Sequence, residues 1–299
     1  MTTILNIIRI NIDPDLIDAG SFTITWHGFF TFIGVLVALI LVTNWGKRRG
    51  ILPDTVHSIA VIGIFGAIIG ARIFHVLDFW DRIYQHDPIR IFYVWQGGIG
   101  IIGAITGGFI FSAGYMLIRN RDALINSWNK IFPWLGRLEK INMPSVGKLA
   151  DITAPALLIS QTLGRIGDVI NGEHFAKATE IAWAFVYRHP QTEALYLNAG
   201  RYPETPTHPA VAYEMIWNMI ALGILWFIFR DRLKPDGMLF ALYATLYSFG
   251  RFFISFARED RIYIAGLDAA QIITLTIMVI GITLLISKAK WSPHKRMSG

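Results

Sequence analysis

Three arginines lie in or at the end of long apolar runs, where a permanent charge is unexpected. Arg165 ends one run, Arg72 ends a second, and Arg251 lies inside a third. Placing an arginine near hydrocarbon costs about 2.5 kcal/mol or more, so such residues are usually kept for a function. A guanidinium is always charged and presents a fork of donors that matches phosphate. The three arginines therefore predict a site for an anionic lipid headgroup.

The segment around Arg165 brings further polar groups together. Gly164 and Gly167 remove side-chain bulk beside the arginine, so a ligand or another backbone can approach closely. The residues that can orient the guanidinium or bind ligand hydroxyls are Asp168, Asn171, Gly172 and Glu173. A simpler alternative is a helix end from which Arg165 reaches to water. The other two arginines at apolar depth favour lipid binding.

Two more segments carry ionisable residues at the edges of apolar runs. Arg251 and Arg258 are seven residues apart, so a continuous helix would present both on one face. Arg258 is equally explained as an ordinary boundary residue. His208-Pro209 opens another run, with Tyr213 and Glu214 in its first turns. Glu214 there is either a partner of the helix dipole or a functional carboxylate, and the sequence alone does not separate the two.

One histidine near the start of the first apolar run is a candidate for proton transfer. His27 lies in Trp26-His27-Gly28, and an imidazole exchanges protons near neutral pH, as a general base must. Packing through a hydrogen bond is the alternative, and His75 is open to the same two interpretations. No HExxH, CxxC, P-loop or GxSxG pattern occurs, so we predict no metal and no other cofactor.

The composition is that of a membrane protein. Of 299 residues, 54% are hydrophobic and 16% are charged, and the mean hydropathy is +0.46. The net charge of +6 does not indicate nucleic-acid binding, because the basic residues cluster in short loops between apolar runs. The absence of cysteine excludes a disulfide and a thiol nucleophile from this chain. No signal peptide is evident, and we expect the first apolar run to be retained.

Seven apolar runs approach the length of about 20 residues that a bilayer requires. They cover residues 26–45, 54–77, 98–118, 150–170, 209–229, 237–256 and 268–287. The fourth contains Pro155 and ends near Gly164 and Gly167, so we expect a break there that lines a cavity or packs on protein. The sequence thus predicts an all-α integral membrane protein with about seven transmembrane helices.

Basic residues set the expected orientation. Lys and Arg cluster after the first, third, fifth and seventh runs, which predicts an N-terminus outside and a C-terminus in the cytoplasm. Residues 1–170 and 209–299 are predicted to form one helical body, and residues 171–208 a small extracytoplasmic cap. The basic and aromatic segment 119–150 is typical of an interfacial helix. Glycine spacing in the second and third runs, Gly66-x-x-x-Gly70 and Gly103-x-x-x-Gly107, favours close helix contacts.

Together these segments resemble the prolipoprotein diacylglyceryl transferase family, from about Ile24 to Ser287. The matching motifs, in the family's order, are Trp26-His27-Gly28, Gly70-Ala71-Arg72, Trp95-Gln96-Gly97-Gly98-Ile99, Gly164-Arg165 with Asn171-Gly172-Glu173, His208-Pro209 with Tyr213-Glu214, and Arg251 with Arg258. The Gly-Arg and Asn-Gly-Glu signature in that order is specific. The family agrees with the seven-span orientation and implies the cytoplasmic (inner) membrane of a bacterium.

The resemblance implies transfer of the diacylglyceryl group from phosphatidylglycerol to the lipobox cysteine thiol of a preprolipoprotein, the first step of bacterial lipoprotein maturation. The nucleophile then belongs to the substrate, which is consistent with a chain that has no cysteine. We predict catalytic roles for Arg251, His27 and Glu173. The residues predicted to bind phosphatidylglycerol are Arg165, Arg72, Asp168, Asn171, Gly172, His208, Tyr213, Glu214 and Arg258. The expected partners are these two substrates and membrane lipid.

Four positions depart from the family pattern. They are Ile102 for the histidine of a His-Gly-Gly motif, His27 for tyrosine, Asp168 for asparagine and Ser255 for glutamate. In one interpretation, His27 or His75 supplies the imidazole from another helix of an active enzyme. In another, the chain is a paralogue that binds lipid or lipoprotein without transfer or acts on a different lipid. An anion transporter is a third interpretation. The retained arginines favour the enzyme.

Overall fold

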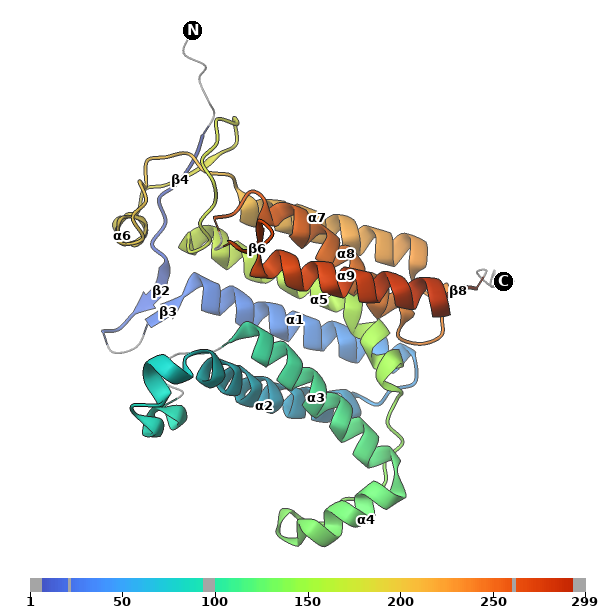
Figure 1. The fold of residues 1–299 in the computed structure, drawn as a ribbon. Coiled ribbons are helices and arrows are strands. Elements are labelled where there is room, and N and C mark those ends of the chain that lie inside the picture. The colour runs from blue at the N-terminus through green and yellow to red at the C-terminus, as the bar shows by residue number, and fades with distance from the viewer. Residues whose placement is uncertain (1–6, 21–22, 94–99, 260–261, 293–299) are drawn as a thin grey trace. The chain divides into compact units, whose positions relative to one another are not determined.

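The computed structural model describes residues 7–20, 23–93, 100–259 and 262–292, and these are mostly helical (Figure 1). Their contacts divide the chain into two units. One unit joins Met1–Leu41 to Ala150–Gly299, and the other is Val42–Leu149. The predicted site residues therefore fall into both units, with Arg72 in the second and all the others in the first.

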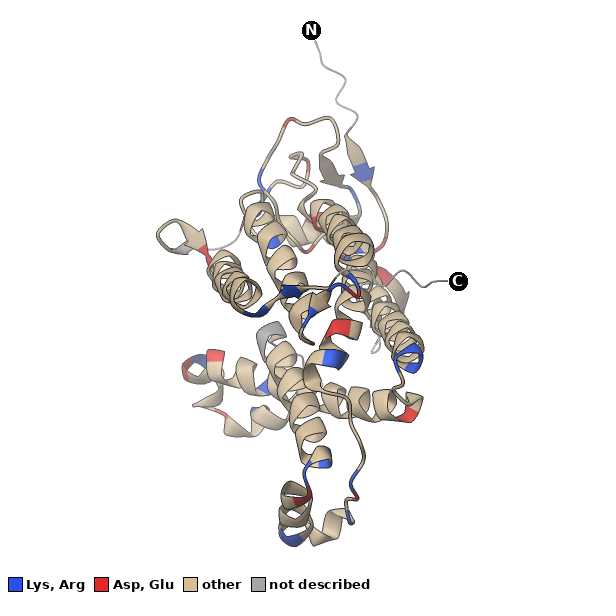
Figure 2. Cartoon of the chain, turned by 90° about the vertical axis from the view of Figure 1, so that its right-hand side faces the viewer, with Lys and Arg blue, Asp and Glu red and all other residues tan. Residues whose placement is uncertain are grey.

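Five helical segments among the described residues are long and apolar enough to cross a membrane. They are α1 (Trp26–Arg48), α2 (Pro53–Asp78), α7 (Ala210–Gly223) continued by η5 (Ile224–Phe229), α8 (Met238–Ser255) and α9 (Ala269–Lys288). Figure 2 shows long uncharged stretches of helix, with Lys, Arg, Asp and Glu mostly toward helix ends and connections. This agrees with the predicted all-α, multi-pass membrane fold, while the number of seven spans and their direction stay predictions.

The third and fourth predicted spans correspond to α3 (Ile101–Asn120) and α5 (Val146–Asn171). The expected break in the fourth span is wrong. The helix continues through Gly164 and Gly167 to its end, with Pro155 inside it. Gly167 remains helical, and its missing side chain lets the backbone at the start of α1 pack against it.

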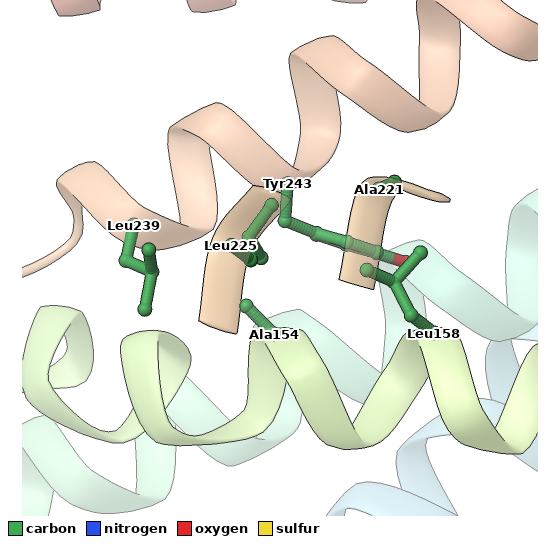
Figure 3. Close-up of a cluster of buried hydrophobic side chains, with 6 residues drawn as sticks. All are labelled: Ala154, Leu158, Ala221, Leu225, Leu239 and Tyr243. Atoms are coloured by element: carbon green, nitrogen blue, oxygen red, sulfur yellow. The ribbon is translucent and has the colours of Figure 1, made fainter. Parts of the chain in front are cut away.

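The apolar core of the first unit lies where α5, α7, η5 and α8 meet (Figure 3). Its buried side chains are Ala154, Leu158, Ala221, Leu225, Leu239 and Tyr243. Asp151, just before this cluster on α5, accepts hydrogen bonds from the backbone N–H groups of Gly237 at 2.8 Å and Phe240 at 2.9 Å. These N–H groups open α8, so Asp151 caps that helix from a neighbouring element and helps to fix where Arg251 lies.

In the second unit, α2 and α3 pack closely through glycines. A Cβ added at Gly70 would collide with the backbone of Gly103, and one added at Gly107 would collide with the carbonyl oxygen of Gly66. The close helix contact predicted from the glycine spacing is therefore confirmed. The other helical elements of this unit are η1 (Trp80–Tyr84), η2 (Pro88–Phe92), α4 (Asp122–Ile131) and η4 (Pro133–Leu135).

The segment 171–208 contains β4 (Phe185–Tyr187) and α6 (Pro190–Asn198), and β1 (Ile8–Ile10) pairs with β4 in parallel. Together they enclose a small apolar core of Ile10, Phe185, Tyr187 and Tyr196. Burial raises the pKa of Tyr196 to about 12 and also raises the pKa of Tyr187, so both phenols are neutral at physiological pH.

Within the described residues, three further strand pairs are short and antiparallel. They are β2 (Asp15–Asp18) with β3 (Thr23–Thr25), β5 (Leu233–Lys234) with β8 (Lys290–Trp291), and β6 (Ile262–Ile264) with β7 (Leu267–Asp268). The first pair leads directly into α1 and so fixes where that helix begins.

Candidate functional site

The end of α5 lies against the start of α1, and this approach positions the site. Gly167 has no Cβ, and one built there would collide with the backbone of Trp26 and His27. The Asn171 side chain, one turn further on, accepts a hydrogen bond at 3.3 Å from the backbone N–H of His27. The close approach that Gly167 permits therefore brings His27 to the side chain of Asp168, the next residue on α5.

Asp168 is one of two buried carboxylates in the site, with 4% of its surface exposed. Its Oδ1 accepts a hydrogen bond from Nδ1 of His27. Its Oδ2 lies 2.6 Å from Nη1 of Arg165 and 3.2 Å from Nε2 of His174. Because a carboxylate only accepts, His27 carries its hydrogen on Nδ1, and Nε2 is the nitrogen that can take a proton. The His27 side chain is 47% exposed, so a substrate can reach it.

Glu214 is the second buried carboxylate and is 3% exposed. Its Oε2 lies 2.5 Å from Nη2 of Arg165, and its Oε1 lies 2.6 Å from Nη1 of Arg251. Nη1 of Arg258 is 3.7 Å from the same Oε1. One carboxylate on α7 thus draws together guanidiniums from α5, from α8 and from the turn that follows α8.

We call Arg165, Arg251, Arg258, Asp168 and Glu214 the ion network. Its three positive and two negative charges leave one positive charge when the neighbouring imidazoles are neutral. Buried ions are costly unless they are paired, so each carboxylate offsets the cost of holding the arginines together. The remaining charge favours binding of an anion, and forked donors favour phosphate. Within the described residues, no group of three or more His, Asp or Glu could hold a metal ion.

Arg258 reaches this site by a route that the sequence did not predict. A shared helical face with Arg251 required a continuous helix, and α8 ends at Ser255. Arg258 lies in the turn beyond the helix, where its backbone forms a bridge with Ala176. The bridge returns the chain to the segment that follows α5, and both arginines still meet Glu214.

The remaining predicted residues of the first unit lie beside the ion network. Oε1 of the exposed Glu173 accepts a hydrogen bond from Asn171 at 3.1 Å. Gly172 ends α5 with φ +69°, a conformation that favours glycine, and turns the chain toward the cap. His208 and Tyr213 contact each other, with 3.2 Å between Nδ1 and the phenol oxygen, at the start of the helix that carries Glu214.

Arg72 lies in the second unit and is used differently. Its Nε donates to the carbonyl oxygen of Ile91 at 2.9 Å, and its Nη2 donates to that of Arg90. Its role in lipid binding stays a prediction. His75 on the same helix stacks on Phe79, with 4.5 Å between ring centroids.

The four positions that depart from the family pattern differ in their contacts and burial. His27 and Asp168 contact each other, so two of them form one hydrogen-bonded pair. Ser255 is buried at the end of α8. Ile102 lies in the first turn of α3, but its side chain and the predicted motif at 95–99 lie outside the described residues.

His174 is a site residue that the sequence analysis missed. Its Nδ1 lies 3.2 Å from Nη2 of Arg258, and its Nε2 lies beside Asp168 and Arg165. In the sequence, only its position directly after Asn171-Gly172-Glu173 indicates a functional role, because a histidine in a polar loop is otherwise common.

Comparison with known proteins places most of the chain in one family. The sequence model described as "Prolipoprotein diacylglyceryl transferase" matches residues 14–287. The phosphatidylglycerol--prolipoprotein diacylglyceryl transferase of Trichormus variabilis is 33% identical, over 93% of this chain and 89% of the relative. The proteins of the same name from Halalkalibacterium halodurans and Limosilactobacillus reuteri are 32% and 31% identical, over 92% and 93% of this chain and 85% and 92% of theirs.

Proposed function

The chain belongs to the prolipoprotein diacylglyceryl transferase family, and we propose how its site performs the transfer. It is a transferase that moves the diacylglyceryl group of phosphatidylglycerol onto a prolipoprotein. In the proposal the acceptor is the thiol of a lipobox cysteine. Its sulfur bonds to the diacylglyceryl carbon that carries the phosphate. The bond from that carbon to the phosphate oxygen breaks, and glycerol phosphate leaves with the bonding electrons.

Arg165, Arg251 and Arg258 hold the lipid phosphate, and their convergence on Glu214 is the observation that carries the proposal. Glu214 keeps the three guanidiniums together before the lipid arrives. The single positive charge that remains in the ion network matches the single negative charge of a phosphodiester. Donors held in place before the reaction stabilise charge that develops in the transition state, and one such donor is worth about 3 kcal/mol.

His27 is the base that takes the thiol proton on Nε2, while Asp168 holds Nδ1. A general base of this kind contributes about 10²–10⁴-fold. The charges then balance at the end of the step. The departing glycerol phosphate carries nearly two negative charges at neutral pH. The imidazolium of His27 adds one positive charge to the one that the ion network already supplies.

The other site residues support these two groups. Asn171 fixes the His27 backbone and also donates to Glu173. In the proposal, the negative charge of Glu173 favours the imidazolium that forms on proton transfer. In the proposal, Gly172, His208 and Tyr213 complete the lipid-binding site.

The positions of these groups along their helices support the proposed membrane placement. His27 opens α1, Asp168 lies in the last turn of α5, Glu214 lies near the start of α7, and Arg251 lies near the end of α8. With seven spans, the N-terminus outside and the C-terminus in the cytoplasm of a bacterium, all four lie at the outer face beside the cap of residues 171–208. Phosphatidylglycerol then enters from the outer leaflet.

The test is a transfer assay on the full chain in detergent, with phosphatidylglycerol and a lipobox-cysteine peptide. Mass spectrometry detects the diacylglyceryl adduct. We expect adduct with the wild type, none with a Cys→Ser peptide, and a loss of about 10²-fold or more with His27→Ala. A folded wild type that binds the lipid and forms no adduct would favour the non-catalytic paralogue instead. An unchanged rate in His27→Ala would exclude His27 as the base.

A further inference from the structure

His174 lies between the arginines and the proposed base. Its Nδ1 is 3.2 Å from Nη2 of Arg258, and its Nε2 is 3.2 Å from Oδ2 of Asp168. The side chain is 29% exposed, so it belongs partly to the buried site. The turn at Gly172 places it there, because the left-handed residue reverses the chain directly after α5.

The contact with Arg258 decides where the hydrogen lies on the His174 ring, while Nη1 of Arg165, 3.3 Å from Nε2, donates to the same Asp168 oxygen. A guanidinium can only donate, so Nδ1 must accept from Arg258. A neutral imidazole with an accepting Nδ1 carries its hydrogen on Nε2, and that hydrogen points to Asp168. The opposite tautomer would set an N–H against the N–H of Arg258 and would leave the Asp168 oxygen facing a lone pair.

The two oxygens of Asp168 therefore have separate tasks. Oδ1 accepts from His27, and Oδ2 is shared by Arg165 and His174. Arg165 also contacts Glu214, and in the proposed reaction it turns donors to the lipid phosphate. His174 is then the contact that keeps Oδ2 in place while Arg165 is engaged, so that Oδ1 stays directed at His27.

We propose that His174 is a positioning residue of the thiol base, acting through Asp168 on His27, with its own tautomer set by Arg258. The inference rests on the proposed function. It adds a physical link between the arginines that bind phosphate and the imidazole that takes the proton. His174 touches neither reacting atom in this account, and its effect passes through one carboxylate oxygen.

The first experiment compares two substitutions in the transfer assay. In His174→Gln the amide oxygen can accept from Arg258 and the amide N–H can donate to Asp168, whereas His174→Leu removes both bonds. Partners that hold a metal-ligating histidine typically contribute 10–100-fold, and by the same logic we expect kcat to fall about tenfold or more in His174→Leu. We expect KM for phosphatidylglycerol to stay within about twofold, and His174→Gln to recover most of the rate. His189→Leu, in the cap, is the matched control and should change neither.

A double-substitution cycle tests the path. If His174 acts through Asp168, His174→Leu has no further effect on kcat in an Asp168→Asn background. Two losses that multiply would overturn the proposal, as would equal rates for His174→Gln and His174→Leu.

A readout without turnover separates this inference from the proposed reaction. Nitrogen-15 NMR of histidine-labelled full-length protein in micelles reports which ring nitrogen carries the hydrogen. We expect His27 to be protonated at Nδ1 in the wild type and in His174→Gln, and to show mixed tautomers in His174→Leu. The same His27 tautomer in all three would overturn the inference even if transfer is observed. The expected pattern in a protein that forms no adduct would retain the link and reject only the reaction.

Discussion

Arg165 and Arg72 have similar sequence surroundings and different partners. Each follows a glycine-containing segment at the end of an apolar run. The two arginines lie on helices of different units. Arg165 divides its donors between the carboxylates of Asp168 and Glu214. The Nε of Arg72 donates a hydrogen bond to the Ile91 carbonyl oxygen. Its guanidinium carbon lies over the Tyr84 ring, 5.5 Å from the ring centroid.

The different partners indicate two roles for a largely buried guanidinium. Carboxylates are anions, and a phosphate that enters can take over the donors that they hold. Backbone carbonyls near the end of η2 instead tie Arg72 to the segment that follows α2, much as a cation caps a helix C-terminus. An arginine at apolar depth therefore indicates a function only when its partners are known.

The largest expected effect tests this distinction directly. Arg165→Gln removes a cation from the phosphate and leaves two buried carboxylates short of a partner. We expect transfer to fall by about 10²–10³-fold. Arg72→Gln should lower transfer much less and should lower the free energy of unfolding by about 1–3 kcal/mol, because two partly buried hydrogen bonds to backbone carbonyls are lost.

The two variants are compared by adduct formation and by unfolding in detergent. Arg72→Lys adds a control, since lysine keeps the charge and cannot reproduce the paired donation to two carbonyls. Transfer lost in Arg72→Gln and restored in Arg72→Lys, with stability unchanged in both, would make Arg72 a lipid ligand and would remove the contrast.

Glu214→Gln tests whether this carboxylate neutralises the arginines or binds substrate. Removing its charge leaves two positive charges in the ion network where there was one, so glycerol phosphate should inhibit about tenfold more strongly, an effect of about 1.4 kcal/mol. We also expect slower turnover and lower stability, because three arginines lose their common partner. Glu204→Gln removes a 76% exposed carboxylate paired with Arg188 and is the control. Weaker inhibition in Glu214→Gln would show that Glu214 binds substrate rather than neutralising the arginines.

A third prediction concerns the packing of the second unit. Gly107→Ala places a methyl group against the α2 backbone, and we expect a loss of about 1–3 kcal/mol of stability. Gly114 lies on the same helix with nothing within 4 Å of an added Cβ, so Gly114→Ala should be neutral or stabilising by up to about 1 kcal/mol. Thermal unfolding of both variants in detergent makes the comparison. Equal effects would mean that α2 and α3 are not held by this contact.

Much of the helical framework could be predicted because apolar length is a local property. The runs at 26–45 and 268–287 correspond to α1 and α9 within a few residues, since Lys47 and Arg48 end the first helix and a capping aspartate, Asp268, opens the second. The continuity of α5 could not be predicted. Glycine is compatible with a break and with close packing, and only the position of His27 against Gly167 decides between them.

Most residues of the candidate site could be proposed from the sequence, but the contacts between them could not. Arg165, Arg251 and Glu214 were recognised by their depth and by the resemblance, but nothing local indicates that one carboxylate joins all three arginines. The pair of His27 and Asp168 links positions 141 residues apart, and such a pairing is fixed by tertiary packing alone. His174 was missed for the same reason.

Tyr196 in the cap contrasts with the ion network, because this buried polar group is neutral and forms no ion pair. Burial raises the pKa of Tyr196 to about 12, above the value of about 10 expected when unfolded. Its contribution to stability is therefore complete below pH 10 and is lost as the pH rises through 12, with about 1 kcal/mol lost by pH 11. Limited proteolysis of the cap at pH 8 and pH 11 measures this loss. Tyr196→Phe cannot ionise and should lose less, whereas Tyr202→Phe, at a 79% exposed position, should behave as the wild type. Equal sensitivity of all three at pH 11 would mean that the cap opens through another group.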